Sequence, residues 1–269
     1  MHFTAPPLPA LGHAITSHLT ERRLLVTNIE LTLPDVAAPL KGFTMAQLSD
    51  LHAGRNRWRP VHLNRAMAVI REAHPDVLVV TGDFLYRDPP LAELDDVFGA
   101  LQSLPMPRIV MLGNHDYYAG AEKACALSRA LEAGGCRVLV NEREDVKRNG
   151  ATVSFVALSD DALAANFEGG VARLMSSPHP RVALIHEPEL AERMPSAAAD
   201  LVLAGHTHGG QIDLPGLTHW IVRHFCGSNY IAGEYLVNGN RMYVNRGLGC
   251  VGVPFRFRAA PELTLVRLR

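Results

Sequence analysis

Apolar runs alternate with amphipathic segments through the first half of the chain. The predicted strands contain uninterrupted apolar stretches, such as VLVV at 77–80, which are typical of strands buried on both faces of a sheet. The predicted helices instead space their apolar residues three or four positions apart. Strands are predicted over 23–33, 42–52, 76–84 and 108–116, and helices over 61–74, 91–101 and 121–135. This alternation predicts an α/β fold.

The second half of the chain is richer in predicted strands. The segments 146–158 and 235–244 each carry an Asn-Gly pair between two apolar runs, which is a strong signal for a β-hairpin. Residues 181–188 and 200–210 are predicted as two more buried strands, and both end in polar residues. We expect one domain over 23–269, preceded by a loosely attached leader over residues 1–22.

Composition and charge narrow the class of protein. The chain has 269 residues, of which 48% are hydrophobic and 20% charged, as in an ordinary globular protein with a sizeable core. A net charge of −1 gives no overall electrostatic reason to expect a nucleic-acid partner. The cysteines lack C-x-x-C spacing, which argues against a disulfide framework or a cysteine metal site and suits a reducing compartment. They are Cys125, Cys136, Cys226 and Cys250.

The sequence carries no recognisable membrane span or export signal. No stretch reaches the uncharged length that crosses a bilayer, and proline and histidine interrupt the first 23 residues before an apolar core forms. We therefore expect a cytoplasmic protein. Peripheral association with a membrane is compatible with this location.

Polar clusters follow five of the predicted strands at the point where each strand ends. Their residues are Asp50, His52, Asp83, Asn114, His115, His186, His206 and His208. Each cluster alone has an ordinary structural interpretation as a helix cap, a turn or a hydrogen-bonded histidine. In open α/β sheets, however, the carboxyl ends of the strands are where ligands bind. Burying so many carboxylates and imidazoles at one edge without a cation would be costly, so the set predicts a shared metal site.

The types of side chain indicate which metals and which reaction to expect. Carboxylates, imidazoles and one carboxamide without a thiolate suit Mn²⁺, Fe or Zn²⁺. The seven candidate ligands exceed the needs of one ion and suit two ions that share a bridging carboxylate; they are Asp50, His52, Asp83, Asn114, His186, His206 and His208. Two-metal sites hold their ions roughly 3.5–4 Å apart and stabilise an in-line displacement at phosphorus. The cluster therefore predicts phosphoester chemistry.

The ordered motifs SDLH, GD, GNHD, H and GHTH, from Asp50 to His208, resemble those of the calcineurin-like metallophosphoesterases. The tail VNRGLGCVGVPFRFRAAPELTLVRL further resembles the YkuE/YaeI-type branch, which shows an R-G-L-G…P-x-R…P-E ending. The resemblance implies a four-layer α/β/β/α sandwich, with a dinuclear metal site at the carboxyl ends of the strands.

The same resemblance implies a role for each candidate residue. One ion would be held by Asp50, His52 and His208, and the other by Asn114, His186 and His206. Asp83 would bridge the two ions. His115 would face the phosphate and stabilise or protonate the leaving oxygen, and Asp116 would orient its neighbours.

The tail adds positive charge to a chain that is nearly neutral. Residues 214–269 contain seven arginines, no lysine and two acids, a local excess of five positive charges. We expect Arg246, in the glycine-rich stretch NRGLG, to bind a substrate phosphate, with a purely structural role as the alternative. Residues 255–258 alternate phenylalanine and arginine, as an amphipathic strand would. The segment 219–225 is predicted as ordinary core, with a lip for an amphiphilic substrate or an anionic membrane surface as the alternative.

The predicted function is that of a dinuclear metal-dependent phosphohydrolase. It would cleave a phosphodiester, pyrophosphate or phosphomonoester by in-line attack of a metal-bound hydroxide. We expect two divalent ions, with Mn²⁺ ahead of Fe or Zn²⁺, and a phosphorylated small molecule or a lipid-linked substrate. We expect neither nucleic acid nor an obligate protein partner. The alternatives are an enzyme like UDP-2,3-diacylglucosamine pyrophosphatase, acting on a lipid-linked nucleotide, and a non-catalytic metal-binding scaffold of the same fold.

Overall fold

The structure is a computed structural model that describes residues 23–269 except 34–35, 55–59, 160 and 162–165. The expected leader over residues 1–22 lies outside the described residues, so that expectation stays a prediction.

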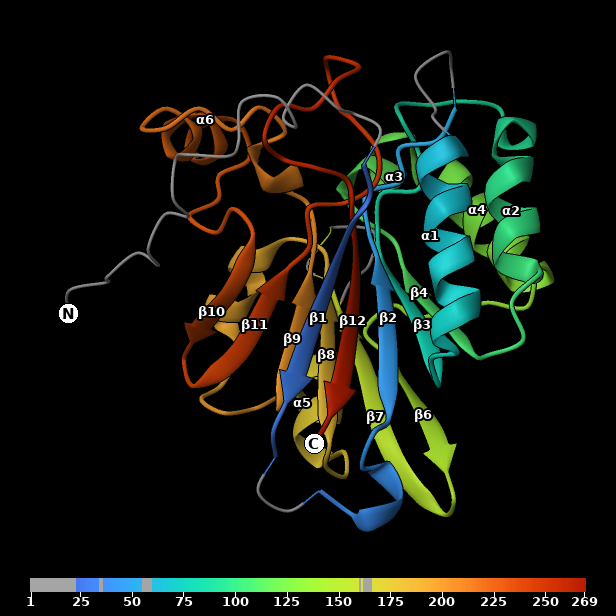
Figure 1. Ribbon diagram of the computed structural model, residues 1–269, viewed down its shortest axis with the longest axis vertical. Coiled ribbons are helices and arrows are strands. Elements are labelled where there is room, and N and C mark those ends of the chain that lie inside the picture. Colours follow the sequence, from blue (N-terminus) through green and yellow to red (C-terminus); the bar gives the residue numbers. More distant parts are fainter. Residues whose placement is uncertain (1–22, 34–35, 55–59, 160, 162–165) are drawn as a thin grey trace.

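Two six-stranded sheets form the centre of the molecule (Figure 1). The first has the order β1-β12-β2-β3-β4-β5, in which β12 runs antiparallel to β2 and the other pairs are parallel. Its strands are β1 (Leu25–Leu31), β12 (Glu262–Leu268), β2 (Thr44–Leu48), β3 (Val77–Thr81), β4 (Arg108–Met111) and β5 (Arg137–Val138).

The second sheet has the order β10-β11-β9-β8-β7-β6. Its strands are β10 (Gly233–Val237), β11 (Asn240–Val244), β9 (Leu201–Ala204), β8 (Arg181–Ile185), β7 (Ala151–Leu158) and β6 (Arg143–Arg148). The outer pairs β10–β11 and β6–β7 are antiparallel and the central pairs are parallel. Both hairpins predicted from the Asn-Gly pairs are therefore confirmed.

Helices cover the outer faces of the two sheets. The first sheet packs against α1 (Pro60–Ala73), α2 (Asp95–Gln102) and α4 (Ala121–Ala133), which stand together beside β2, β3 and β4 in Figure 1. The second sheet packs against α5 (Phe167–Ser176) and the 3₁₀ segment η4 (Pro188–Arg193). The remaining short elements are η1 (Ala38–Leu40), η3 (Leu91–Leu94), α3 (Asn114–Tyr118), η5 (His208–Gly210) and α6 (Thr218–Phe225).

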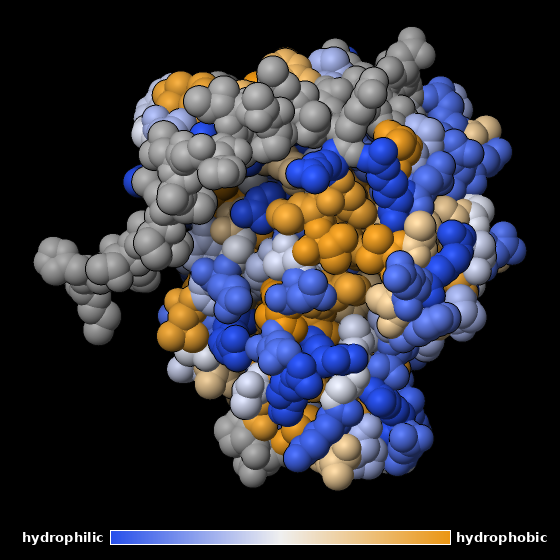
Figure 2. Space-filling model, in the orientation of Figure 1, coloured by the Kyte–Doolittle hydropathy of each residue, from blue (hydrophilic) through white to orange (hydrophobic). Residues whose placement is uncertain are grey.

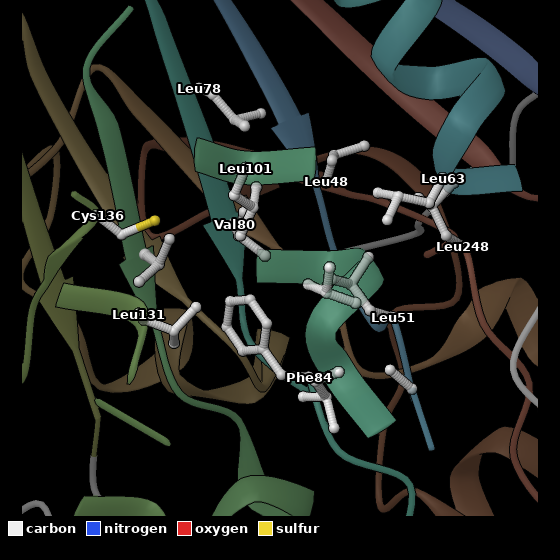
Figure 3. Packing of buried hydrophobic residues seen from close by; sticks show 14 of the residues in the cluster. Leu48, Leu51, Leu63, Leu78, Val80, Phe84, Leu101, Leu131, Cys136 and Leu248 are labelled. Atoms are coloured by element: carbon white, nitrogen blue, oxygen red, sulfur yellow. The ribbon is translucent and has the colours of Figure 1, made fainter. Parts of the chain in front are cut away.

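The alternation of side chains along each strand divides the core into three layers. In β3, Leu78 and Val80 point into the cluster under the helices, whereas Val77 and Val79 point into the cluster between the sheets. Figure 3 shows part of the first cluster, where Phe84 and Leu101 pack near Val80. A third cluster lies between the second sheet and α5. Three apolar layers separate four layers of secondary structure, so the predicted α/β/β/α sandwich is confirmed.

The structure departs from the predicted elements at residues 114–116, which were predicted as the end of a strand and lie in the helix α3, and at two places in the tail. Residues 255–258 form no strand: only Phe257 and Arg258 form isolated bridges, both to Ile212, and Arg256 is 5% exposed whereas Phe255 is 44% exposed. The amphipathic-strand interpretation is therefore wrong, because the buried side chain is the arginine. In the segment predicted as core, 219–225, Val222 is buried but Trp220 is 58% exposed on α6. That prediction holds for only one face of the helix.

Candidate metal centre

All seven predicted ligands lie directly after the carboxyl ends of central strands. The first sheet contributes Asp50 and His52 after β2, Asp83 after β3 and Asn114 after β4, and the second sheet contributes His186 after β8 and His206 and His208 after β9. Because these strands are neighbours in their sheets, their polar ends meet at one edge of the sandwich. The structure therefore brings together the residues that the sequence placed at five separate strand ends.

Asp50, His52 and His208 form one group of ligand atoms. One ligand atom from each lies within 4.8 Å of the others, and all three residues are buried. The Nε2 atoms of His52 and His208 are 2.9 Å apart, and His208 Nε2 lies 3.4 Å from Asp50 Oδ1. Two imidazole nitrogens and a carboxylate oxygen thus face a common point.

Asp83, His186, Asn114 and His206 form a second group beside the first. Asn114 Oδ1 lies 3.0 Å from His186 Nε2 and 3.1 Å from His206 Nδ1. Asp83 Oδ2 lies 3.2 Å from His186 Nε2 and 3.4 Å from His52 Nε2, so its carboxylate faces both groups. This is the position that a shared carboxylate would need.

Backbone carbonyls hold the far nitrogens of three histidines. His52 Nδ1 lies 3.1 Å from Leu85 O, His186 Nδ1 lies 2.7 Å from Thr81 O, and His206 Nε2 lies 3.4 Å from Cys226 O. A carbonyl only accepts, so each of these nitrogens carries a proton, and the other nitrogen of each ring faces the cluster. The imidazoles are therefore oriented as metal ligands.

The charges in the cluster are strongly unbalanced. Burial lowers the pKa of His52 to about 3, and burial together with the charge on His186 lowers the pKa of His206 to about 4. Burial opposes the charged form of His186 as well, but Asp83 and Asp50 outweigh it and raise the pKa of His186 to about 10. Burial raises the pKa of Asp50 to about 6. Anionic and neutral donors are thus packed against one imidazolium. Divalent cations bound here would stabilise the buried carboxylate charges.

The backbone is strained around the candidate ligands. Five of the seven adopt left-handed φ angles between 46° and 75°: Asp50, His52, Asp83, His206 and His208. Such angles are uncommon outside glycine and cluster at functional sites. Gly113 allows a close approach, since a Cβ there would lie 2.2 Å from Asp83 Oδ1. The donor set, its orientation and this strain fit a site for divalent cations.

Comparison with known proteins identifies the family. The model of the calcineurin-like phosphoesterases matches residues 43–210, more than half of the chain. The chain belongs to this family. YkuE, a metallophosphoesterase of Bacillus subtilis, is 32% identical, with 85% of this chain and 79% of YkuE covered. The phosphodiesterase YaeI of Escherichia coli is 30% identical, with 87% of this chain and 84% of YaeI covered. The UDP-2,3-diacylglucosamine pyrophosphatase LpxG of Chlamydia trachomatis is 26% identical, with 96% of this chain and 93% of LpxG covered.

The protein is therefore a metallophosphoesterase, a metal-binding hydrolase that acts on phosphate esters. Its similarity to both YkuE and YaeI over most of the chain confirms the resemblance seen in the tail. Among the residues that the structure describes, none of the helices combines the length and apolar character needed to span a bilayer.

His115 stands beside the candidate centre of this metallophosphoesterase. Its half-buried ring lies edge-on to the ring of His52, with centroids 4.8 Å apart, and its backbone N–H donates to Asp83 Oδ1 over 2.9 Å. The neighbouring Asp116 is fully buried and accepts backbone N–H groups from Gly113 and Leu85. Asp116 thus ties the GNHD turn to the loop that carries Asp83, which is an orienting contact of the kind expected.

Arg246 of this metallophosphoesterase is held by an ion pair. Its Nη1 lies 3.0 Å from Oε2 of Glu262, whose side chain is completely buried, and its backbone N–H donates to the same oxygen. Glu262 also accepts from the hydroxyl of Tyr243, so this network joins β12 of one sheet to β11 of the other. The guanidinium of Arg246 therefore has a structural partner, and a phosphate contact stays a prediction.

Arg256 contacts the candidate centre, a position that the sequence did not predict. Its Nη2 lies 3.1 Å from His208 Nδ1, and its Nη1 donates to the backbone carbonyl of the same histidine over 3.1 Å. Its Nε donates to Gly249 O over 2.8 Å. The P-x-R element of the tail contains this arginine, but its alternation with Phe255 and Phe257 suggested a solvated strand face. Only the packing of the tail against His208 reveals the contact.

Proposed function

We propose that the protein is a dinuclear metal-dependent phosphodiesterase or pyrophosphatase. The observation that carries the proposal is the Asp83 carboxylate, which faces His52 in one group of donors and His186 in the other. In this proposal the first ion is held by Asp50, His52 and His208 and the second by Asn114, His186 and His206, with Asp83 shared between them. Oxygen and imidazole donors without a thiolate favour Mn²⁺, with Fe or Zn²⁺ as alternatives.

In this proposal the metal ligands and His115 have separate catalytic roles. When bound, the two ions supply Lewis-acid charge to the phosphoryl group and to the attacking water. His115 holds a proton on a ring nitrogen beside the cluster and passes it to the leaving oxygen. Its backbone bond to Asp83 fixes the distance between this proton donor and the ligands.

The names of the relatives support the choice of substrate class. YaeI is a phosphodiesterase and LpxG a UDP-2,3-diacylglucosamine pyrophosphatase. We propose a small phosphodiester or pyrophosphate as substrate, and a lipid-linked nucleotide as the second candidate. The alternative of a non-catalytic scaffold is disfavoured, because all seven ligand positions and His115 hold functional side chains. We also propose a cytoplasmic location, because the scattered cysteines without C-x-x-C spacing suit a reducing compartment.

A substrate panel tests the proposed class. The metal-loaded protein should hydrolyse bis-p-nitrophenyl phosphate and a nucleotide pyrophosphate with higher kcat/KM than p-nitrophenyl phosphate, and a chelator should abolish all three activities. Turnover of the monoester alone would contradict the proposed substrate class. Two bound ions without turnover of any ester would instead favour the scaffold.

Arg246 is included in the proposal as a phosphate-binding residue, and a double variant separates that role from its ion pair. Arg246→Ala alone leaves the buried Glu262 carboxylate without its cation, so a loss of stability is expected in addition to a raised KM. Adding Glu262→Gln removes the unpaired charge. If KM stays raised in a double variant that is as stable as the wild type, the guanidinium binds substrate. A KM restored to the wild-type value would assign Arg246 a structural role only.

A further inference from the structure

Two segments next to the metal centre expose large apolar side chains to solvent. Leu214, Leu217 and Trp220 are 37%, 43% and 58% exposed on α6 and the turn before it, and Val253 and Phe255 are 41% and 44% exposed in the loop 251–258. We call these five residues the apolar rim. Large exposed apolar side chains gathered at one place indicate an interaction surface.

Both segments of the apolar rim are fastened to the loop that carries His206 and His208. Helix α6 packs directly on that loop, because a Cβ at Gly210 would lie 2.3 Å from Thr218 Cγ2. The loop 251–258 is held by Gln211, whose Nε2 donates to Val251 O over 2.8 Å and to Val253 O over 3.0 Å. Figure 1 shows α6 and this loop at the same end of the molecule, above the sheets.

Among the described residues, α6 carries one unpaired formal charge beside the apolar rim, the exposed Arg223, while Asp213 just before the rim pairs with Arg258 over 3.7 Å. Residues 214–233 contain no aspartate or glutamate, whereas Arg223 and two histidines are exposed on α6. The indole of Trp220 stacks on His224, with ring centroids 5.1 Å apart and planes 5° from parallel. Figure 2 shows apolar residues reaching the surface over α6. Exposed tryptophan and leucine beside basic side chains are typical of helices that lie in the interface of a membrane.

We propose that the apolar rim docks the protein on an anionic phospholipid surface. The bilayer interface would take up Leu217, Trp220 and Phe255, and acidic headgroups would complement Arg223. A second copy of this chain is a poorer occupant, because a symmetric contact would bring the Arg223 guanidinium of one copy against that of the other. Docking would hold the edge of the sandwich with His206 and His208 close to the headgroups. The proposal does not depend on which phosphate ester the centre cleaves.

Vesicle flotation of the full chain tests the docking surface. We expect binding to vesicles of phosphatidylcholine with phosphatidylglycerol, little binding to phosphatidylcholine alone, and weaker binding at high salt. Serine at Leu217, Trp220 and Phe255 together should reduce binding by about tenfold or more, since it removes the apolar area that enters the interface. In a Trp58→Phe background, which leaves Trp220 as the single tryptophan, fluorescence should shift to the blue on the anionic vesicles.

A matched control uses exposed apolar residues outside the apolar rim. Leu236→Ser on β10 and Met175→Ser on α5 remove side chains that are 66% and 42% exposed, and vesicle binding should stay unchanged. Hydrolysis of a soluble ester should also be unchanged in the serine variant of the rim, which separates this test from the proposed function. Absence of vesicle binding, or binding that survives the triple substitution, would overturn the proposal. So would a concentration-dependent dimer that the triple substitution dissociates.

Discussion

At the scale of single residues, Asp83 and His115 lie next to each other but contact the candidate metal ligands in different ways. The Asp83 carboxylate faces both groups of donors, so Asp83→Asn should lower metal content and activity together. His115 contacts the cluster through its ring edge and backbone, so His115→Ala should keep the metals and lower kcat by about 10²–10⁴, the usual range for a general acid. The measurements are metal content and kcat of both variants on an alkyl ester and on a nitrophenyl ester.

The leaving group serves as the internal control for His115. A nitrophenolate needs little protonation, so the loss in His115→Ala should be smaller on the nitrophenyl ester than on the alkyl ester. Loss of a metal from this variant would make His115 a ligand, and full activity on the alkyl ester would make it structural.

Arg256 should control the orientation of His208. Alanine at this position removes the guanidinium that lies against His208 Nδ1 and leaves the half-buried Gly249 carbonyl without its donor, so we expect lower stability and weaker metal binding. Arg256→Lys can still donate to carbonyls but lacks the planar fork, so it should recover stability more than metal affinity. Thermal melting of the metal-free proteins measures the change in stability, and metal titration measures the change in metal affinity. Equal metal affinity in the wild type, Arg256→Ala and Arg256→Lys would rule out the orienting role.

The proton on His186 predicts how metal binding depends on pH. Carboxylates raise the pKa of this imidazole to about 10, so at neutral pH an ion must displace its proton. Metal affinity should therefore rise with pH from neutrality toward pH 10. In the metal-free protein this charge stabilises the fold below the ordinary histidine pKa of about 6.5, and the contribution is lost as pH rises toward 10. Calorimetry in buffers of different ionisation enthalpy should detect the released proton; binding without proton release would refute this assignment.

At the scale of the elements, a glycine at the end of β4 sets the spacing of the centre. A Cβ at Gly113 would lie 2.2 Å from Asp83 Oδ1 and 2.8 Å from His186 Cε1, so Gly113→Ala should displace both side chains and lower metal content and kcat. Gly99→Ala is the matched control, because no atom lies within 4 Å of a Cβ at this position in α2. Alanine there should raise the free energy of unfolding by about 0.5–1 kcal/mol. Normal metal content in Gly113→Ala would show that the loop can adjust.

The elements that the sequence predicted well are those with a strong local pattern. The apolar runs of β3 and β8 and the Asn-Gly hairpins depend on neighbouring residues, so the local sequence was enough to predict them. The helix α3 was not predicted, because it begins at Asn114 within a turn that Asp116 closes through Gly113 and a distant loop. The burial of Arg256 likewise depends on carbonyls from Gly249 and His208, which no sequence window contains together.

At the scale of the whole molecule, the centre joins the two sheets at one edge. The first sheet supplies four of the seven candidate ligands and the second sheet supplies three, and the apolar layer between the sheets holds the two sets opposite each other. The sequence predicted which residues meet, because each follows a buried strand. It could not predict which nitrogen of each histidine faces the cluster, since that depends on carbonyls of Leu85, Thr81 and Cys226 for three of the four rings and on Arg256 for His208. The sandwich therefore fixes the orientation of the ligands as well as their proximity.

The most direct test of the dinuclear centre is a titration of the metal-stripped protein with Mn²⁺. Bound metal and the rate of hydrolysis of bis-p-nitrophenyl phosphate would be followed in the same sample. We predict saturation at two ions per chain, with most of the activity appearing as the second site fills. Full activity at one ion per chain, or saturation at one ion with every ligand intact, would contradict a centre in which Asp83 is shared between two metals.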